Sequence, residues 1–363
     1  MRTTAFRNLA DAVVDLSAKT VFLVGENGQG KTNFLEAVYF CSYASSFRAA
    51  KDGDLGRNGL KDFSVAGTVC RNPADSAFSN EILVKREGEK KTVLIDDKKA
   101  EDRKELLSVI PCIVFCHDDM NFVKGSPEQC RWFFDQVLSL YDPAYLEDLR
   151  SYRKSLRSRN AVLRDALKNR LDGEADSLLD ALDAQCAFYG TALMEKRRTA
   201  AVLFSEVFSP LYGEVSGIEG MEVRYVPSWK GSEEDVLREG LRRRRQQDLA
   251  AGLSMTGPHR DRYLFVLEGA DFVATASTGQ RRLLALLLRV AQARRFSQMT
   301  GRNPVLLLDD VLLEMDGGKR RRFLSVLPGY DQAFFTFLPD EPFDRYQNGE
   351  TLVYNVAGGK VEK

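Results

Sequence analysis

The chain has 363 residues, 44% of them hydrophobic and 29% charged, enough to bury the core of one large domain or two moderate ones. Lysine and arginine together number 52, as do aspartate and glutamate, so no net charge attracts the whole protein to nucleic acid or to a membrane. Any polyanion-binding site must therefore be a local patch.

The six cysteines are scattered without paired spacing, and a chain this long does not need disulfides to fold. Cys112 and Cys116 are spaced like half of a zinc site, but only His117 and His259 could join them and no second cysteine pair follows. The N-terminal residues lack the pattern of an export signal, so we expect none, and no apolar run approaches the roughly 20 residues that span a bilayer. We expect a cytoplasmic protein with reduced thiols, no zinc and no membrane contact.

The first predicted element is a buried strand at residues 20–24, a β-branched and aromatic run. A helical pattern follows at 33–40. The loop between them matches G-x-x-x-x-G-K-[ST] at every fixed position and reads Gly25-Glu26-Asn27-Gly28-Gln29-Gly30-Lys31-Thr32. Strand, glycine loop and helix form the setting that a phosphate-binding P-loop requires.

The residue types of this loop suit ATP. Glycines let backbone N–H groups approach the phosphates, and the following helix directs its positive end at the same anions. Lys31 is expected to reach the β and γ phosphates, and the Thr32 hydroxyl to bind Mg²⁺. We therefore predict ATP and Mg²⁺ as ligands, with the nucleotide bound by the loop and by Asn33.

Between this helix and the middle of the chain, residues 63–69, 81–85 and 92–95 carry alternating or β-branched patterns. They predict a small antiparallel sheet attached to the nucleotide-binding part.

A mostly helical pattern then runs from about residue 126 to 248. At its start Ser126 can cap a helix, Pro127 suits the first position and Gln129 can bond back. Breaks argue against one long coiled coil and are expected at Asp172-Gly173, Pro210, Pro227 and Gly231. We predict half of an ATPase head at 1–125, a helical lobe at 126–250, and the other half of the head at 251–363.

Two basic clusters on this lobe are candidates for contact with DNA phosphates. They are Arg150, Arg153, Lys154, Arg157 and Arg159, and the run from Arg242 to Arg245. The alternative is an ordinary solvated helix face. Few aromatic residues lie nearby, which favours backbone contact over base reading.

Two further motifs follow. Ser277-Thr278-Gly279-Gln280 precedes the apolar run at 283–288, so a Ser-Gly turn caps a buried helix and offers a second anion site. Because the P-loop already binds the phosphates, we expect this site to serve a partner chain's nucleotide.

The apolar strand at 305–308 ends in Asp309-Asp310. Asp309 is the expected Mg²⁺ acid and Asp310 the general base for the attacking water. The alternative is a polar exit from a core strand.

These three motifs in this order resemble the head of an ABC or SMC-type ATPase, and within that group the chain is similar to the RecF family along nearly its whole length. Gly-Pro-His-Arg-Asp is the most specific block, because the broader ATPase group lacks it. The matching segments are Phe6-Arg7-Asn8-Leu9, Gly25 to Asn33, Ser46-Phe47-Arg48, Val123-Lys124-Gly125-Ser126-Pro127-Glu128, Tyr152 with Leu156 and Arg159-Asn160, Thr256-Gly257-Pro258-His259-Arg260-Asp261, and Leu308-Asp309-Asp310-Val311.

The resemblance implies an α/β P-loop head of the ABC/SMC type, with a small antiparallel β subsheet and an inserted, mostly helical lobe. It implies an ATPase that dimerises around two nucleotides and binds single-stranded, gapped or junction DNA. It also implies roles in replication, in recombinase loading with RecO and RecR, and in SOS induction. By position, Ser277 and Gly279 would contact the γ-phosphate in trans, and Glu314-Met315-Asp316 would lie between the nucleotides.

Other functions remain open. A transporter's energy-coupling subunit normally has a switch histidine after the acidic strand, and the strand at 333–337 has none. An ATPase with an appended nuclease would need a separate acidic metal cluster, which the sequence does not offer. A module that binds ATP and hydrolyses it only slowly is a further alternative, although Asp310 favours some hydrolysis.

Overall fold

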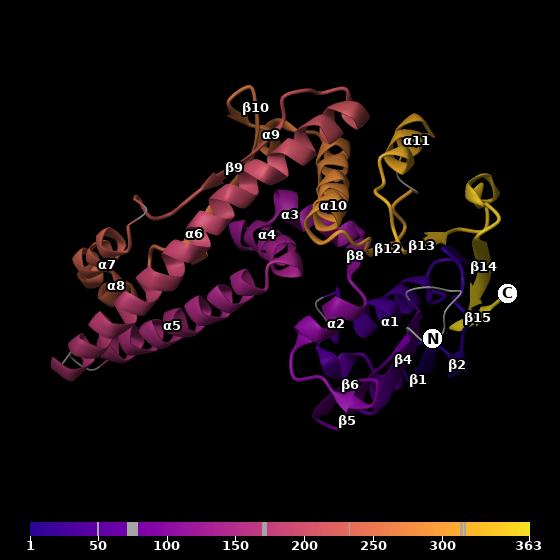
Figure 1. Cartoon of the computed structure of the whole chain (residues 1–363), viewed down its shortest axis with the longest axis horizontal. Coiled ribbons are helices and arrows are strands. Elements are labelled where there is room, and N and C mark those ends of the chain that lie inside the picture. Colours follow the sequence, from indigo (N-terminus) through magenta and orange to yellow (C-terminus); the bar gives the residue numbers. More distant parts are fainter. Residues whose placement is uncertain (49–50, 71–78, 169–172, 232, 313–314, 316) are drawn as a thin grey trace. The chain divides into compact units, whose positions relative to one another are not determined.

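The computed structural model describes residues 1–48, 51–70, 79–168, 173–231, 233–312, 315 and 317–363 (Figure 1). The chain forms two compact units. The first unit comprises Met1–Asp119 and Phe296–Lys363, and the second unit is Met120–Arg295.

The first unit contains a sheet in which the strands of both ATPase motifs are central. Its described strands are, in order, β15 (Lys360–Glu362), β14 (Thr351–Ala357), β3 (Thr20–Val24), β13 (Gln332–Phe337), β12 (Val305–Leu308) and β8 (Cys112–Phe115). All neighbours pair in parallel except β15, which is antiparallel to β14. Every residue of β3, β8 and β12 is buried, as expected of parallel strands covered on both faces.

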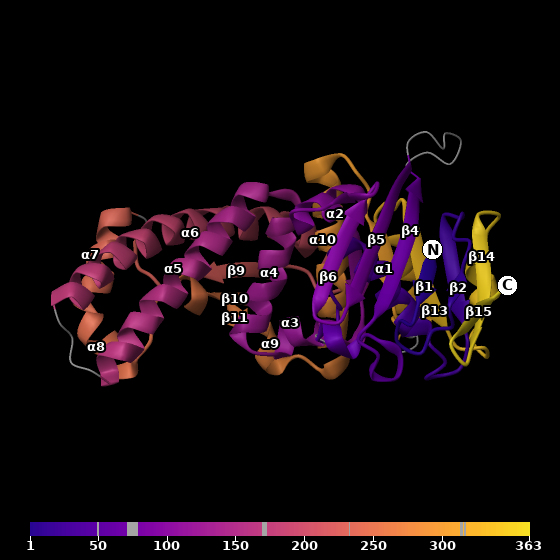
Figure 2. The same cartoon turned by 90° about the horizontal axis from the view of Figure 1, so that it is seen from below.

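A second sheet in this unit is antiparallel. Its order is β2 (Ala12–Val13), β1 (Arg2–Thr4), β4 (Phe63–Cys70), β5 (Ser79–Glu87), β6 (Lys90–Ile95) and β7 (Lys98–Lys99), and Figure 2 shows several of these strands side by side. The predicted antiparallel subsheet is therefore confirmed, and β1, β2 and β7 extend it.

Helix α1 (Lys31–Tyr43) joins the two sheets. Its buried residues Phe34 and Phe40 belong to a core cluster that also contains residues of β3 and β4. Burying each phenylalanine contributes about 1.5–3 kcal/mol. The remaining helical elements of the unit are η1 (Asp52–Asp54), η2 (Arg57–Gly59), α2 (Arg103–Val109), η4 (His117–Met120, which ends at the unit boundary), α11 (Gly317–Ser325) and η6 (Phe343–Tyr346).

The second unit is mostly helical. Its long helices α5 (Pro143–Lys168) and α6 (Gly173–Ser216) pack side by side. A short sheet has the order β11 (Ala270–Asp271), β10 (Arg262–Leu267), β9 (Glu222–Val226). The other elements are α3 (Asn121–Lys124), α4 (Pro127–Tyr141), α7 (Glu234–Arg243), α8 (Arg245–Ala251), η5 (Pro258–Arg260), α9 (Phe272–Thr275) and α10 (Thr278–Thr300), whose last residues belong to the first unit.

The predicted start of α4 is confirmed. Ser126 Oγ accepts a hydrogen bond from the Gln129 N–H at 3.4 Å, and Gln129 Oε1 accepts one from the Ser126 N–H at 2.8 Å. With Pro127 at the first helical position, this reciprocal pair forms a capping box.

The predicted helix break at Pro210 is wrong. Helix α6 runs through it for 44 residues. Pro210 and Glu206, whose carbonyl loses its helical partner, lie on the exposed side, where water can satisfy that oxygen. On the other side, Phe208 and Tyr212 are fully buried, so packing stabilises the helix across the proline.

The compact units divide the chain at other points than the predicted boundaries of 125/126 and 250/251. The second unit extends past residue 250 because β10 pairs with β9 along Arg262–Val266 and Glu222–Val226. The division into ATPase head and lobe at the predicted residues stays a prediction.

Candidate nucleotide-binding site

Three neighbouring parallel strands bring the ATPase motifs together at one edge of the first unit's sheet. Val24 pairs with Phe337, and Leu308 pairs with Phe335. The P-loop after β3, the end of β13 and Asp309 after β12 therefore lie at the same carboxyl edge. This edge is where parallel α/β sheets bind their ligands.

The P-loop begins at a glycine that packing requires. The Gly25 N–H donates to the Phe337 carbonyl at 3.1 Å, and a Cβ at Gly25 would lie 2.2 Å from the Val356 carbonyl oxygen. Gly28 and Gly30 have φ of 78° and 119°, which other residues rarely adopt. Glu26 and Asn27 are exposed, and the chain turns at Asn27 and Gly28.

The C-terminal hairpin fastens the loop in place. Gln29 Oε1 accepts a hydrogen bond from the Gly358 N–H at 2.6 Å, and the Gln29 carbonyl accepts one from the Gly359 N–H at 2.9 Å. The loop thus takes its shape from residues more than 300 positions away, which preorganises its N–H groups.

Lys31 is held inside the loop. Its side chain is only 4% exposed, and Nζ donates to the carbonyls of Gly25 at 2.6 Å and Glu26 at 3.1 Å. Gly30 precedes α1 as its N-cap, and among the described residues no side chain caps the helix. The first N–H groups of α1, together with the Lys31 ammonium, therefore form an anion-binding environment.

The two predicted acids are held by threonines: Asp309 contacts Thr32, and Asp310 contacts Thr336 of β13. The Thr32 hydroxyl donates to Asp309 Oδ1 at 2.9 Å, joining residues 277 positions apart. Thr336 Oγ1 accepts from the Asp310 N–H at 2.7 Å and donates to Asp310 Oδ1 at 2.9 Å. Asp310 has φ of 51°, a left-handed conformation that its own contacts with Thr336 stabilise.

Burial and the neighbouring Asp310 make the charged form of Asp309 less favourable at this edge of the sheet. Burial and then the neighbouring Asp310 raise the pKa of Asp309 to about 6, although the Thr32 hydroxyl opposes this. A divalent cation would offset both effects, so the donor pair of Thr32 and Asp309 fits Mg²⁺. Among the described residues no three His, Cys, Asp or Glu side chains cluster to bind a metal.

A buried ion network supports the first turns of α1. Glu36 is fully buried, and Arg7 donates Nε to Oε2 at 2.8 Å and Nη2 to Oε1 at 2.9 Å. Burial alone would raise the pKa of Glu36, but hydrogen bonds from Arg7, Arg48 and Ser46 outweigh it and lower that pKa.

This network reaches the P-loop through Asn33. Arg48 Nη2 donates to Asn33 Oδ1 at 2.5 Å, and Asn33 Nδ2 donates to Asn8 Oδ1 at 2.6 Å. Asn8 in turn donates to the Gly28 carbonyl at 3.4 Å. Asn33 is thus a support of the loop through its side chain. Sequence reasoning quoted Asn8 and Arg48 in matching segments but gave them no role, and it missed Thr336 and Glu36.

The Ser-Gly turn lies in the second unit, at the start of α10. Ser277 Oγ accepts from the Gln280 N–H at 3.2 Å, and Gln280 Oε1 accepts from the Ser277 N–H at 2.8 Å, which confirms the predicted cap. Ser277 and Gly279 are exposed, and a Cβ at Gly279 would meet no atom within 4 Å. Packing within the described chain does not require this glycine. Glu314 and Asp316, predicted to lie between nucleotides, are outside the described residues.

Comparisons with known proteins show which family this chain belongs to. The model of the RecF/RecN/SMC N-terminal domain matches residues 1–347. The chain is 41% identical to the "DNA replication and repair protein RecF" of Treponema pallidum (strain Nichols) over 359 residues, covering 99% of each chain. This chain belongs to the RecF family. It is also 29% identical to the RecF protein of Bacillus subtilis (strain 168), over 100% of this chain and 99% of that one.

Solved structures agree with the RecF assignment. One described as the recombination mediator protein RecF-ATP in the RecFOR pathway is 28% identical, with a TM-score of 0.88 over 100% of this chain and 96% of that one. An Smc head domain from Pyrococcus furiosus is 16% identical, with a TM-score of 0.51 over 99% of this chain and 94% of that one, and is similar in fold alone. The predicted α/β head of the ABC/SMC type is confirmed.

The Gly-Pro-His-Arg-Asp block of this RecF-family chain is a packing centre of the second unit. His259 Nε2 lies 3.0 Å from the Ser254 carbonyl, so it must donate there, and Nδ1 then accepts from the Tyr152 hydroxyl at 2.7 Å. Burial lowers the pKa of His259 to about 4, which keeps the ring neutral. The motif thus joins α5 to the segment before β10.

Asp261 of the same block binds a buried arginine. Arg197 Nη1 contacts Asp261 Oδ2 at 3.0 Å and the Pro258 carbonyl at 2.7 Å, while Nη2 contacts Asp135 at 2.7 Å. Asp261 also accepts from the Tyr225 hydroxyl and, at 2.7 Å, from the Ser228 N–H. The block holds α4, α6 and β9 together, which gives it a structural role.

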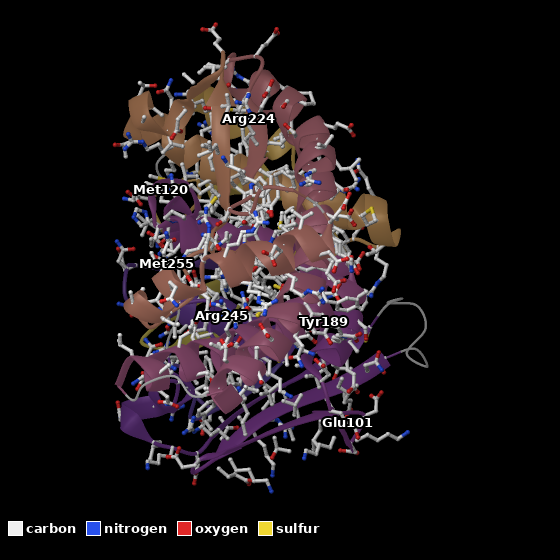
Figure 3. All side chains as sticks on the ribbon, turned by 90° about the vertical axis from the view of Figure 1, so that its left-hand side faces the viewer. Glu101, Met120, Tyr189, Arg224, Arg245 and Met255 are labelled. Atoms are coloured by element: carbon white, nitrogen blue, oxygen red, sulfur yellow. The ribbon has the colours of Figure 1, made fainter. Side chains whose placement is uncertain are left out.

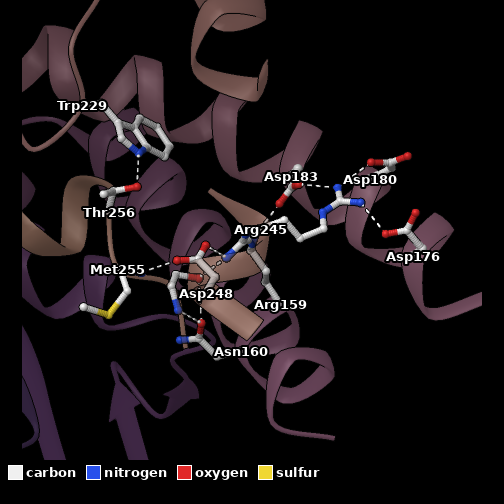
Figure 4. A network of polar contacts seen from close by, with 11 residues as sticks. Arg159, Asn160, Asp176, Asp180, Asp183, Trp229, Arg245, Asp248, Met255 and Thr256 are labelled. Carbon is white, nitrogen blue, oxygen red and sulfur yellow. Dashed lines mark hydrogen bonds and ion pairs between the residues drawn. The ribbon is translucent and has the colours of Figure 1, made fainter. Parts of the chain in front are cut away.

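The prediction of DNA contact is wrong for two of the candidate arginines. Arg159 is fully buried, with Nε 2.6 Å from Asp183 and Nη1 2.7 Å from Asp248 (Figure 4). Arg245 is 7% exposed and pairs at 2.5–2.7 Å with Asp176, Asp180 and Asp183. Both arginines neutralise carboxylates between α5, α6 and α8, so neither side chain is exposed for contact with a phosphate.

A pocket of about 480 Å³ lies in the second unit between α6 and β9. Arg224, labelled in Figure 3, is one of its lining residues. Its lining includes no P-loop residue, so it is separate from the nucleotide site. No helix in the described part of the chain is long and apolar enough to cross a membrane.

Proposed function

We propose that this chain is a cytoplasmic, ATP-dependent DNA-binding protein of recombinational repair and replication. ATP closes it as a homodimer on single-stranded, gapped or junction DNA, where it works with RecO- and RecR-like mediators in recombinase loading and SOS induction. The observation that carries the ATPase part is the contact of Thr32 with Asp309 beneath a preformed P-loop. The names of the relatives, which concern DNA replication, repair and the RecFOR pathway, support the rest.

The nucleotide part of the proposal assigns roles by geometry. The P-loop N–H groups and Lys31 bind the phosphates, since the ammonium already lies within the loop. Thr32 and Asp309 would hold Mg²⁺, which would neutralise phosphate charge there. Asp310 accepts the proton of the attacking water, and Thr336 positions its carboxylate through a 2.9 Å hydrogen bond.

The dimer part concerns the exposed start of α10. Ser277, Gly279 and Gln280 present a hydroxyl, free space and helix N–H groups to solvent. We infer that the γ-phosphate of a nucleotide bound to the partner chain occupies this space. A side chain at position 279 would then collide with the partner's nucleotide, while leaving the isolated chain undisturbed.

The other candidate functions have weaker support. A transporter's energy-coupling subunit would need a switch histidine on the strand after the acids, and β13 carries Thr336 beside them instead. A nuclease would need an acidic metal cluster, and none of three or more ligands occurs among the residues that the structure describes.

Sedimentation velocity of the wild type and of Lys31→Ala, with and without Mg-ATP and a gapped duplex, tests the proposal. Wild-type dimers that form on DNA only with Mg-ATP, and are absent in Lys31→Ala, are the expected result. A monomer that binds ATP yet ignores DNA at low salt would retain the P-loop assignment and refute the repair function.

A further inference from the structure

The two basic clusters of the second unit differ in how many of their side chains form ion pairs with carboxylates. On α7, Arg242 lies 3.8 Å from Asp180 and Arg243 lies 3.0 Å from Glu239, while Arg238 lies 3.1 Å from Asp235. With Arg245 buried among aspartates, each of these four charges is opposed by a carboxylate, whereas the exposed Arg244 has no ion pair with a described residue. Most of the positive charge of this cluster is therefore offset.

The cluster on α5 differs because its charges form a stripe with few acidic residues along the same helix. No aspartate or glutamate occurs between Asp148 and Asp165. The exposed basic residues follow the helical repeat on one face and are Arg150, Arg153, Lys154, Arg157 and Arg164. These five residues are named the α5 stripe.

Most of the stripe is available for a ligand. No ion pair is present for Lys154, Arg157 or Arg164 with any other described residue, and all three are exposed. Arg153 lies 3.1 Å from Asp135, but its side chain remains 55% exposed. The stripe spans about 21 Å along the helix, which corresponds to about six base-pair steps of B-DNA.

The opposite face of α5 holds the stripe rigidly. Buried Tyr145, Tyr152 and Leu163 pack into the unit, and Arg159 is locked between Asp183 and Asp248. The helix cannot rotate without breaking these buried ion pairs. The positive charges therefore keep a fixed spacing.

The chemistry of the stripe selects a phosphate backbone. Between Arg150 and Arg164 the other exposed side chains are Ser158 and Ala161. A membrane surface would need large apolar groups beside the cations, and single-stranded nucleic acid would need aromatic side chains for base stacking. Leu167, one turn beyond the stripe, is the nearest exposed large apolar side chain of this helix. A straight row of cations with neither group within it matches the repeating phosphates of a duplex.

We propose that the α5 stripe binds the sugar-phosphate backbone of duplex DNA without reading its sequence. This inference rests on the proposed DNA-binding function and names the surface that performs it. Bound this way, the duplex part of a gapped substrate lies along α5, and the affinity depends strongly on salt because phosphate counterions are released.

The test compares two triple variants that each remove three charges from the same unit. The stripe variant is Lys154→Gln, Arg157→Gln, Arg164→Gln, and the matched control is Arg238→Gln, Arg242→Gln, Arg243→Gln. Fluorescence anisotropy with a labelled 30-base-pair duplex and Mg-ATP is recorded from 50 to 200 mM salt. ATP binding and thermal unfolding are measured for both, to show that each variant is folded.

For the stripe variant, the slope of log affinity against log salt becomes shallower by about three, whereas the control keeps nearly the wild-type slope. The wild-type advantage over the stripe variant then shrinks about fortyfold between 50 and 200 mM salt. A third protein, with Arg157→Lys and Arg164→Lys, keeps the wild-type slope because it keeps the charges.

Two results would overturn the inference, and only the second would also refute the proposed function. Equal losses in the stripe variant and the control, with wild-type binding intact, refute the stripe but leave the proposed function standing. Absence of wild-type DNA binding even at 50 mM salt refutes both.

Discussion

Replacing Asp309 by asparagine is expected to stabilise the nucleotide-free protein. Burial and the adjacent Asp310 raise the pKa of Asp309 from 3.8 to about 6, which corresponds to about 3 kcal/mol of unfavourable free energy for the charged form. Asparagine removes that charge and keeps an oxygen to accept the 2.9 Å hydrogen bond from Thr32. The same variant should lose ATP turnover, because the proposed Mg²⁺ ligand is gone.

The sign of this effect depends on pH. Because the folded-state pKa is raised, the carboxyl favours folding below pH 3.8, and this contribution is lost as the pH rises through about 6. Asp309→Asn should therefore match the wild type near pH 4 and exceed its unfolding free energy by up to about 3 kcal/mol at pH 8. For a unit of this size the midpoint would rise by at most about 6–12 °C.

Differential scanning fluorimetry of nucleotide-free protein between pH 4 and pH 8 measures this difference. Asp340→Asn is the matched control, since Asp340 is an exposed carboxylate of the same unit, and we expect little change at either pH. A destabilised Asp309→Asn at pH 8, or a gain of equal size at both pH values, would show that the charge is not strained in the folded protein.

Three further variants test other parts of the structure. Thr336→Val should cost about 1–3 kcal/mol, because it leaves the Asp310 N–H without its partner, and should slow single-turnover ATP hydrolysis about 10- to 100-fold, whereas Thr336→Ser retains both. Arg197→Met should cost about 3–5 kcal/mol in chemical unfolding, because it removes the arginine that pairs with buried Asp261 and leaves buried Asp135 with Arg153 alone, and equal losses in Arg198→Met, its exposed neighbour, would contradict this. Gly279→Ala should change stability by less than about 0.5 kcal/mol yet prevent ATP-driven dimers in sedimentation, and normal dimerisation would refute the trans contact.

Local motifs could be predicted from the sequence because their chemistry is contained in a few neighbouring residues. The strand at Thr20–Val24 and the strand at Val305–Leu308 have the predicted bounds, since uninterrupted apolar runs leave only one way to bury them. The caps at Ser126 and Ser277 also formed as expected, because a capping box needs only residues three positions apart.

Pairing partners distant in sequence could not be predicted. Thr336 lies in a run of buried residues and reads as an ordinary strand position until β12 is placed beside β13. Glu36 reads as an exposed helix residue until Arg7 and Arg48 are brought to it. A buried acid and a surface acid are identical in sequence, and only the tertiary contacts distinguish them.

The sequence by itself determined where this protein can bind phosphate and which family its motifs resemble, because both depend on the spacing of adjacent residues. Only the tertiary structure decided which charges are free to act. Arg157 and Arg159 stand two positions apart on one helix, yet one is exposed and the other is fully buried between two aspartates. The physical reason is that a helix turns by about 100° per residue, so its contacts with α6 and α8 determine which cations face water.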